Sequence, residues 1–394
     1  MKSKNTPIIL LIFLLICNFL RADLIDFYKK GTIKLEASLD FGKGTDWEAL
    51  FYDEKKDLVA APDGSIFVSN FLQHNVFKFT RDGKYIKKFG RKGRGPGDLY
   101  RVGNLSILDG RYLVIGEYAT ARRISLFDLS GKYVKVLKTN HSVFSSVALK
   151  ENKIAYLTYR YVDKNKSQLV KNIVIIIKDA ETGNETVVDS IKIPALGTIV
   201  LQQTAAIMVK NNAGDVLIAR TKDGNLLVGA SNTPDIKIYS IKGKLLRYFH
   251  LEMKPLPVTD KYIQKYKDDF MSHVKGEDGS RPSSKWMIKK MEAFSFDKLF
   301  LEHLPYYREI LVDSEGNILV FKWTDCIGDC VEIFQVYSPD GKYICETRID
   351  KGMFDFKIDS NMKNIIFTSR GIFGLFQLKD SDDVSLRLVK VDIK

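Results

Sequence analysis

The chain has 394 residues, of which 45% are hydrophobic and 11% aromatic, with 27 glycines and 10 prolines. This composition excludes a disordered or collagen-like chain and fits one large domain or two ordinary ones. The formal net charge of +13 favours anionic partners, although a generally lysine-rich surface gives the same total. Eighteen tyrosines and 24 phenylalanines, beside many valines and isoleucines, favour strands over helices.

Residues 1–22 have the pattern of a signal peptide. Lys2 and Lys4 form a basic start, and the apolar run 8–20 is too short to cross a bilayer as a helix. We expect cleavage after Ala22, with lipidation of Cys17 and retention as an uncleaved anchor as alternatives. The sequence therefore predicts an exported protein, periplasmic or extracellular, which touches a membrane only if its N-terminus anchors it. Because exported proteins rarely meet nucleic acid, no nucleic-acid partner is expected.

Repeated hairpins dominate the rest of the chain. Each has apolar–polar alternation on both sides of a polar turn, which is the β-hairpin pattern. Hairpins with a Gly-Lys turn, and one looser version, occupy 77–90, 125–138, 236–249, 334–347 and 174–190. A second hairpin precedes most of these, at 58–70, 105–117, 216–230 and 310–322, with weaker forms at 149–159 and 356–369.

Two hairpins make four strands in roughly 45–50 residues, which is the size of one propeller blade. The pattern predicts an all-β fold over residues 23–394, a six-bladed β-propeller of four-stranded blades. The last blade lacks a fourth strand, while the strand-like segment 32–42 has no partner nearby. We therefore expect 32–42 to close the ring beside Val384–Val391, which removes an open sheet edge.

The segment 255–303 interrupts the repeat between blades four and five. Its stretches 260–274 and 284–294 suit helices, with Asp260 and Ser284 as predicted N-caps. We expect this small helical insertion to cap the propeller, because so few aliphatic residues make a poor independent core.

Two cysteines lie close together in the predicted blade five. Cys326 and Cys330 are expected to form a local disulfide in an oxidising compartment, while Cys345 stands alone. The pair supplies too few ligands for a zinc site.

The stretch 57–101 closely resembles the NHL repeat. Its ending, FGRKGRGPGDLYR, is similar to the glycine-rich link between blades in six-bladed propellers exported by bacteria, and 304–320 resembles the blade that follows their helical insertion. The resemblance implies a propeller fold and export, and it implies no established activity. Propellers of one fold serve binding, lyase and lactonase roles.

The glycine-rich link 90–97 is a candidate anion site. Its backbone N–H groups and the side chains of Arg91 and Arg94 suit an anion, although the same glycines also serve a tight crossing between blades. A second candidate is the ring formed where each blade's second strand ends. Counting from the turns places there Asn70, Gly116, Thr158, Ala230, Lys322 and Ser369. This ring holds no carboxylate or histidine, so no metal site and no cofactor are predicted.

Aromatic and cationic residues gather near the same expected ends, which suits an anionic or glycan ligand. The candidate ligand-binding residues are Asn70, Glu117 (the acid nearest to the ring), Arg122, Tyr159, Arg160, Lys322, Trp323 and Arg370. The five histidines are scattered and no GxSxG motif occurs, so no catalytic residue is assigned. The sequence favours a non-catalytic propeller that binds a protein, peptide or glycan at the channel mouth. Anionic members of these classes are included among the expected ligands. The alternative is a propeller-type hydrolase or lyase, lactonase-like or peptide-modifying.

Overall fold

A computed structural model describes most of the chain. The described residues are 24–35, 37–41, 57–82, 84–118, 121–164, 168–201, 204–209, 213–277, 282–296, 300–324, 331–350, 354–355, 365–368, 371–378 and 387–391.

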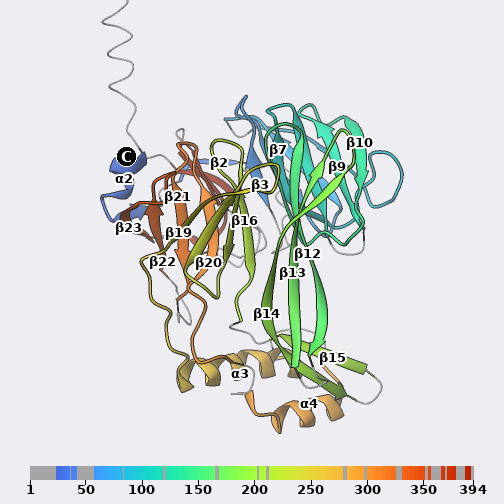
Figure 1. Cartoon of the computed structure of the whole chain (residues 1–394), viewed down its shortest axis with the longest axis vertical. Coiled ribbons are helices and arrows are strands. Elements are labelled where there is room, and N and C mark those ends of the chain that lie inside the picture. Colours follow the sequence, from blue (N-terminus) through green and yellow to red (C-terminus); the bar gives the residue numbers. More distant parts are fainter. Residues whose placement is uncertain are drawn as a thin grey trace, which may run out of the picture.

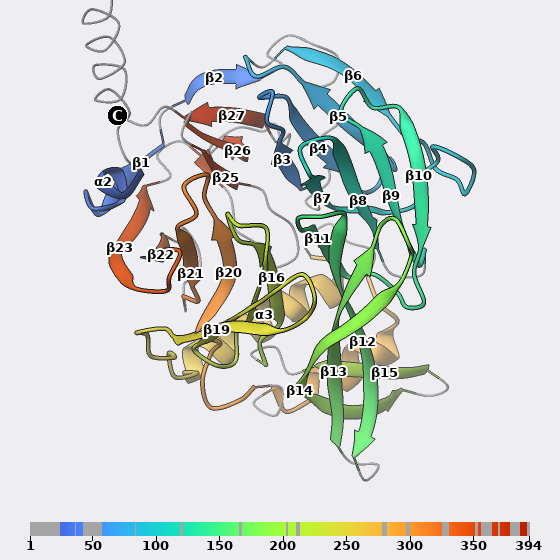
Figure 2. The same cartoon turned by 45° about the horizontal axis from the view of Figure 1, so that its top comes forward.

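Six sheets stand around a central axis, which confirms the six-bladed propeller (Figures 1 and 2). Blade one comprises β3 (Leu58–Ala60), β4 (Ile66–Asn70), β5 (Asn75–Phe79) and β6 (Tyr85–Phe89), and blade two comprises β7 (Val102–Leu108), β8 (Tyr112–Glu117), β9 (Arg123–Asp128) and β10 (Tyr133–Lys138). Blade four comprises β16 (Val216–Arg220), β17 (Leu226–Ala230), β18 (Asp235–Tyr239) and β19 (Leu245–His250). Blade five comprises β20 (Tyr307–Val312), β21 (Ile318–Lys322), β22 (Glu332–Tyr337) and β23 (Tyr343–Asp350). Buried apolar clusters form within the blades and between neighbouring ones, as between blades four and five.

Several turns of the blades contain a residue with positive φ, and this residue is not always a glycine. Gly341 takes a φ of 87° in the turn of blade five, and a Cβ there would lie 2.6 Å from the Phe249 ring. The turn between the first two strands of blade three, at 150–153, has no glycine, and there Glu151 and Asn152 take the left-handed conformation. The Asp109 carboxylate accepts a hydrogen bond from the Asn152 backbone N–H at 2.9 Å, which holds this costly geometry.

Blade three is larger than the repeat predicts. It comprises β11 (Ser145–Ala148), β12 (Lys153–Lys164), β13 (Gln168–Asp179), β14 (Glu185–Leu201) and a fifth strand, β15 (Thr204–Val209). The three long strands extend beyond the ring at the end where the helices lie (Figure 1). The expectation of four short strands in this blade was wrong, because apolar alternation alone does not say where a long strand leaves the core.

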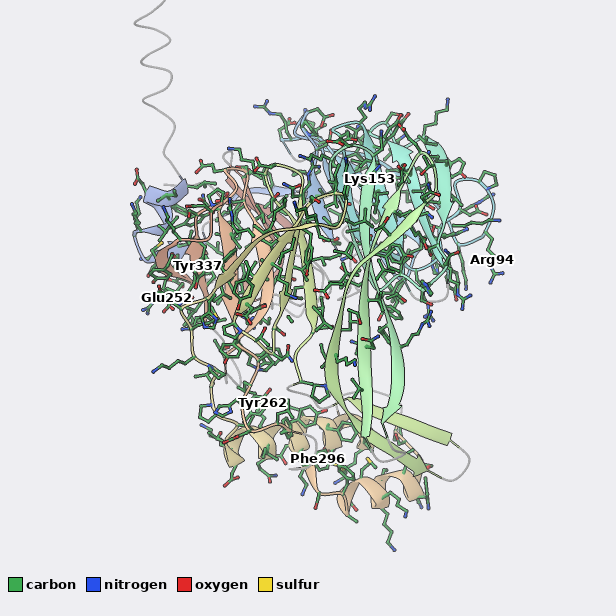
Figure 3. The ribbon with its side chains drawn as sticks, in the orientation of Figure 1. Arg94, Lys153, Glu252, Tyr262, Phe296 and Tyr337 are labelled. Atoms are coloured by element: carbon green, nitrogen blue, oxygen red, sulfur yellow. The ribbon has the colours of Figure 1, made fainter. Side chains whose placement is uncertain are left out.

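The helical insertion forms as predicted. It contains α3 (Asp260–Lys275) and α4 (Lys285–Glu292), and Ser284 caps α4 by accepting the Met287 N–H. For α3 the predicted cap Asp260 was wrong: it is the first helical residue, and Thr259 Oγ1 accepts the Tyr262 N–H at 3.2 Å. Met271, Met291, Phe296 and Phe300 form the buried core of the insertion, and Figure 3 shows Tyr262 and Phe296 together at this end of the molecule.

The N-terminal segment closes the ring, but it divides between two blades. As predicted, β2 (Ala37–Phe41) pairs antiparallel with β27 (Arg387–Val391) of blade six. The preceding β1 (Thr32–Lys34) instead pairs in parallel with β23 of blade five. The short helix α2 (Leu24–Tyr28) buries Leu24 and Tyr28 against blades five and six, so the segment joins the two blades.

The strand assignment in blade six needs a correction. We expected 356–369 to form the first hairpin, with Ile365–Thr368 as its second strand. In the structure β25 (Ile365–Thr368) pairs with β26 (Gly371–Leu378), as does β24 (Phe354–Asp355), and the sheet continues through β27 to β2. Ile365–Thr368 is therefore an innermost strand, and Thr368 lies at the opposite mouth of the channel from the ring in which its neighbour Ser369 was placed.

Candidate functional site

The six innermost strands surround a cavity of about 290 Å³ on the propeller axis. All six run in the same direction along the axis, and their C-terminal halves form the cavity wall. Leu58, Leu105, Val147, Ala219, Leu311 and Ile366 supply one apolar wall residue from each blade. The cavity wall is therefore mainly apolar, with Asp313, Ser314 and Thr368 among its few polar residues.

A wider cavity of about 540 Å³ adjoins the channel where the innermost strands turn outward. Turn residues such as Pro62, Gly110 and Ser314 line it. Arg220, the last residue of β16, lines both cavities, so the two adjoin at this side chain. This cavity is the mouth of the channel at the end where the innermost strands finish.

Arg220 is half-buried, and its side chain reaches from blade four to blade two. Its Nη1 donates a hydrogen bond to the Ile107 carbonyl at 3.1 Å. Burial lowers the pKa of Arg220, and the charge of Asp109 opposes that shift. A guanidinium has five N–H donors, and among the described residues only this one bond engages them. Most of its donors are thus available to an acceptor in the cavity.

Polar groups on the channel edge of the innermost strands are bonded by neighbouring side chains. Asp57 accepts the N–H of Leu58 at 3.0 Å and that of Leu105 in the next blade at 2.6 Å. Ser106 Oγ accepts the Ala148 N–H at 2.9 Å. Since these backbone groups already have partners, the channel presents mainly its apolar side chains.

The acids at the starts of three innermost strands were not predicted from the sequence. Asp215 and Glu309 repeat the role of Asp57, each accepting the next residue's N–H at 2.9 and 2.8 Å. An acid directly before β3 and β16, and another near the start of β20, was the available signal, but the expected ring was placed by counting only from the second strands. No cluster of three or more metal-ligating side chains occurs among the described residues.

Of the predicted ligand-binding residues that the structure describes, those at the ends of the second strands lie toward the opposite mouth, on the side of the helical insertion. Tyr159 packs on Phe144 with ring centroids 3.9 Å apart, and Lys171 Nζ lies 4.8 Å from the Tyr159 ring. Arg160 is exposed, with Nη2 3.5 Å from Nδ1 of His141. The structure therefore brings Tyr159 and Arg160 into an aromatic and basic group at the edge of blade three.

Other predicted residues are engaged separately. Lys322 pairs with Glu346 at 3.1 Å, and the Trp323 backbone N–H donates to the Tyr306 carbonyl at 3.3 Å. Asn70 is buried, and its Oδ1 accepts the Gln73 N–H at 3.0 Å. The structure does not gather these residues into one site.

Arg122 is exposed, with a φ of 49°, and Arg370, Cys326 and Cys330 lie outside the described residues. The Arg370 site and the disulfide therefore stay predictions.

The glycine-rich link binds a carboxylate of its own chain. Asp98 accepts hydrogen bonds from Arg91 Nε at 2.8 Å and from the Gly95 N–H at 2.9 Å. A Cβ on Gly93 would lie 2.3 Å from Asp98 Oδ2, so the glycine admits this carboxylate. Arg94 points outward at the rim (Figure 3). The predicted anion site is thus occupied from within, which favours the structural interpretation of the link.

Glu117 belongs to the same link. Its side chain is fully buried and accepts hydrogen bonds from Arg123 Nε and the Tyr100 N–H, both at 2.7 Å, and from Ser125. Arg123 in turn donates to the Gly93 carbonyl at 2.9 Å. Burial raises the pKa of Glu117, against the bond from Ser125 and the charge of Arg123. The carboxylate fastens the link and does not face the channel.

Comparison with known proteins agrees with the fold. A family model described as a 6-bladed beta-propeller, DUF5128, matches residues 54–213. A member of the DUF4221 family from Bacteroides vulgatus has a similar structure, with a TM-score of 0.50 and 11% identity, covering 91% of this chain and 97% of that one. The "Putative exported protein" of Bacteroides fragilis has a TM-score of 0.49 and 10% identity, covering 92% and 99%. The calcium-binding protein regucalcin from Agrobacterium tumefaciens has a TM-score of 0.39 and 9% identity, covering 91% and 96%. No curated protein matches the chain in sequence. The resemblance to NHL repeats stays a prediction.

Proposed function

We propose that this protein is an exported, non-catalytic binding propeller that holds an acidic group of its ligand at the open channel mouth. The observation that carries the proposal is the position of Arg220 where two cavities adjoin. Its guanidinium donates one hydrogen bond among the described residues and keeps further donors for a ligand. Arginine binds carboxylate, sulfate and phosphate through paired hydrogen bonds.

The overall charge supports an acidic partner. Removal of the predicted signal peptide takes away Lys2, Lys4 and Arg21 and leaves a net charge of +10. An acidic group borne by a protein, peptide or glycan would be attracted by this field, and its affinity should fall as salt rises.

Replacing Arg220 with Gln tests the site. Acetate, succinate, octanoate and sulfate are titrated into the wild-type protein and into Arg220→Gln, and binding is followed by calorimetry. Loss of hydrogen bonds to a charged group costs about 1.5–3 kcal/mol, so the variant should bind a recognised acid roughly 10- to 100-fold more weakly. Arg160→Gln is the control, because it removes an exposed arginine at the opposite mouth.

Two results would overturn the proposal. In one, none of the four acids binds saturably to the wild-type protein. In the other, Arg220→Gln binds as well as the wild type while Arg160→Gln loses binding, which would return the site to the residues predicted from sequence.

Catalysis would need a reactive group facing the ligand. Asp313 lines the channel, and its carboxylate accepts hydrogen bonds from the Tyr28 hydroxyl at 3.0 Å and from Asn317 Nδ2 at 2.9 Å. Asp57, Asp215 and Glu309 lie at or near the starts of the channel strands, and each accepts a backbone N–H. This engagement supports binding without turnover. Chemical change of a bound acid, seen by mass spectrometry after incubation, would instead establish a hydrolase or lyase.

Export remains part of the proposal. Among the described residues, no helix is long and apolar enough to cross a membrane. Leu24, two residues after the predicted cleavage site, is already buried and its N–H donates to Glu315 at 3.2 Å. We expect N-terminal sequencing of the exported protein to begin close to Asp23. A mature chain that retains Met1, or that begins at a lipidated Cys17, would contradict this cleavage.

A further inference from the structure

Behind the arginine, the channel is a narrow and mostly apolar space. Its wall is built from aliphatic residues of all six innermost strands, such as Leu105, Val147 and Leu311. The cavity of about 290 Å³ adjoins the mouth, because Ala60, Ile107 and Arg220 line both. A ligand whose acidic group meets Arg220 therefore has an apolar compartment directly beside that group.

The edges of the innermost strands would normally disfavour an apolar guest, because they present unpaired backbone groups. Here side chains of the protein bond these groups at the depth of the cavity. The N–H groups of Leu105 and Ala148 bond to Asp57 and Ser106, and Arg220 bonds the Ile107 carbonyl. An apolar chain can thus enter without leaving those polar groups unpaired, and its contact with the wall is favourable.

The Arg220 guanidinium lies at the inner end of the mouth, with the neighbouring Asp109 carboxylate held by the Asn152 N–H at 2.9 Å. Arg81 also lines the mouth, from the turn that follows β5. Asp313 also lines the narrow cavity, but its carboxylate accepts hydrogen bonds from the Tyr28 hydroxyl and from Asn317 Nδ2. Two arginines at the wide end and mainly aliphatic residues at the narrow end therefore give the cavity a polar-to-apolar gradient along the propeller axis.

From this gradient we infer that the ligand is an amphipathic acid, a carboxylate on a flexible hydrocarbon chain, whose chain lies in the channel and whose carboxylate bonds to Arg220. The inference rests on the proposed function, since both use Arg220, and it adds the apolar part of the ligand. Affinity should then depend on chain length as well as on charge.

The test compares acetate, butanoate, hexanoate and octanoate, with octanol as the uncharged control, by calorimetry on the full-length protein. Burying one methylene group contributes roughly fourfold in affinity, so octanoate should bind at least about 100-fold more tightly than acetate. Octanol should bind more weakly than octanoate, and Arg220→Gln should remove that difference.

A second variant fills the channel while leaving the arginine. Ala60→Leu places a larger side chain at a half-buried position that lines both cavities. In this variant the affinity should no longer increase with the chain length of the acid, whereas acetate binding should be kept. Its melting temperature reports whether it folds.

The outcomes separate the inference from the proposed function. If acetate and octanoate bind equally and both depend on Arg220, or if Ala60→Leu leaves the chain-length dependence intact, the acyl inference is overturned and the acid site stands. If no acid binds, or if binding ignores Arg220, the proposed function fails and the inference fails with it.

Discussion

A chain without residues 24–41 is expected to aggregate or to unfold far below the melting temperature of the intact protein. The deletion removes α2, β1 and β2 and exposes the edges of β23 and β27, which β1 and β2 cover. It also removes Leu24, Tyr28 and Ile33, each with 0% of its surface exposed. Burial of one such side chain contributes about 1.5–3 kcal/mol. The summed contribution of the segment is therefore comparable with the free energy of unfolding of a whole domain, typically about 5–15 kcal/mol. Solubility and circular dichroism melting measure the effect.

Point variants test the contribution of the N-terminal segment to stability without deleting residues. Ile33→Ala opens a cavity in the cluster that joins the N-terminal segment to blades five and six, and should cost about 2–5 kcal/mol. Leu246→Ala, at a position 53% exposed on the outermost strand of blade four, is the matched control and should change stability little. Equal melting temperatures for the two variants would show that β1 does not hold the ring closed.

Glu117→Ala is expected to cause the second large effect. The change leaves the buried Arg123 without its carboxylate at 2.7 Å and removes the acceptor for the Tyr100 N–H. Breaking a buried ion pair from one side costs about 3–5 kcal/mol, which corresponds to several degrees of melting temperature in a large domain. Because Arg123 also holds the Gly93 carbonyl, the link between blades one and two should become sensitive to proteolysis.

Arg91→Ala provides the control for Glu117→Ala within the same link. The Arg91 side chain is 85% exposed, and exposed ion pairs contribute about 0–1 kcal/mol. Its melting temperature should therefore stay close to that of the wild type. If Glu117→Ala and Arg91→Ala have the same melting temperature, the buried network does not stabilise the link. A role for Glu117 in ligand binding then becomes the better explanation of this residue.

Local pattern determined the blades of this protein. Alternation around polar turns located the hairpins of blades one, two, four and five, because strand period and turn chemistry are properties of neighbouring residues. The same reasoning predicted the helices of the insertion, since caps such as Ser284 act within one turn. The partner of β2 was also predictable. The repeat requires four strands in each blade, and the last blade has only three from its own segment of the sequence.

Only the tertiary structure decided how distant segments combine. The parallel pairing of β1 with β23 joins residues far apart in the chain, and no local pattern specifies it. The hairpin of β25 and β26 lacks the usual turn signal, so the inner strand of blade six was misplaced.

The candidate site depended on the same long-range arrangement. Arg220 ends an ordinary strand in the sequence, and only the ring places it beside Ile107 of blade two. Conversely, Glu117 was predicted among the ligand-binding residues, and packing turns its carboxylate inward to Arg123. The sequence by itself thus determined the elements and the repeat, whereas the assembled ring decided which charges face the channel, because burial and long-range contacts exist only once the blades have packed together.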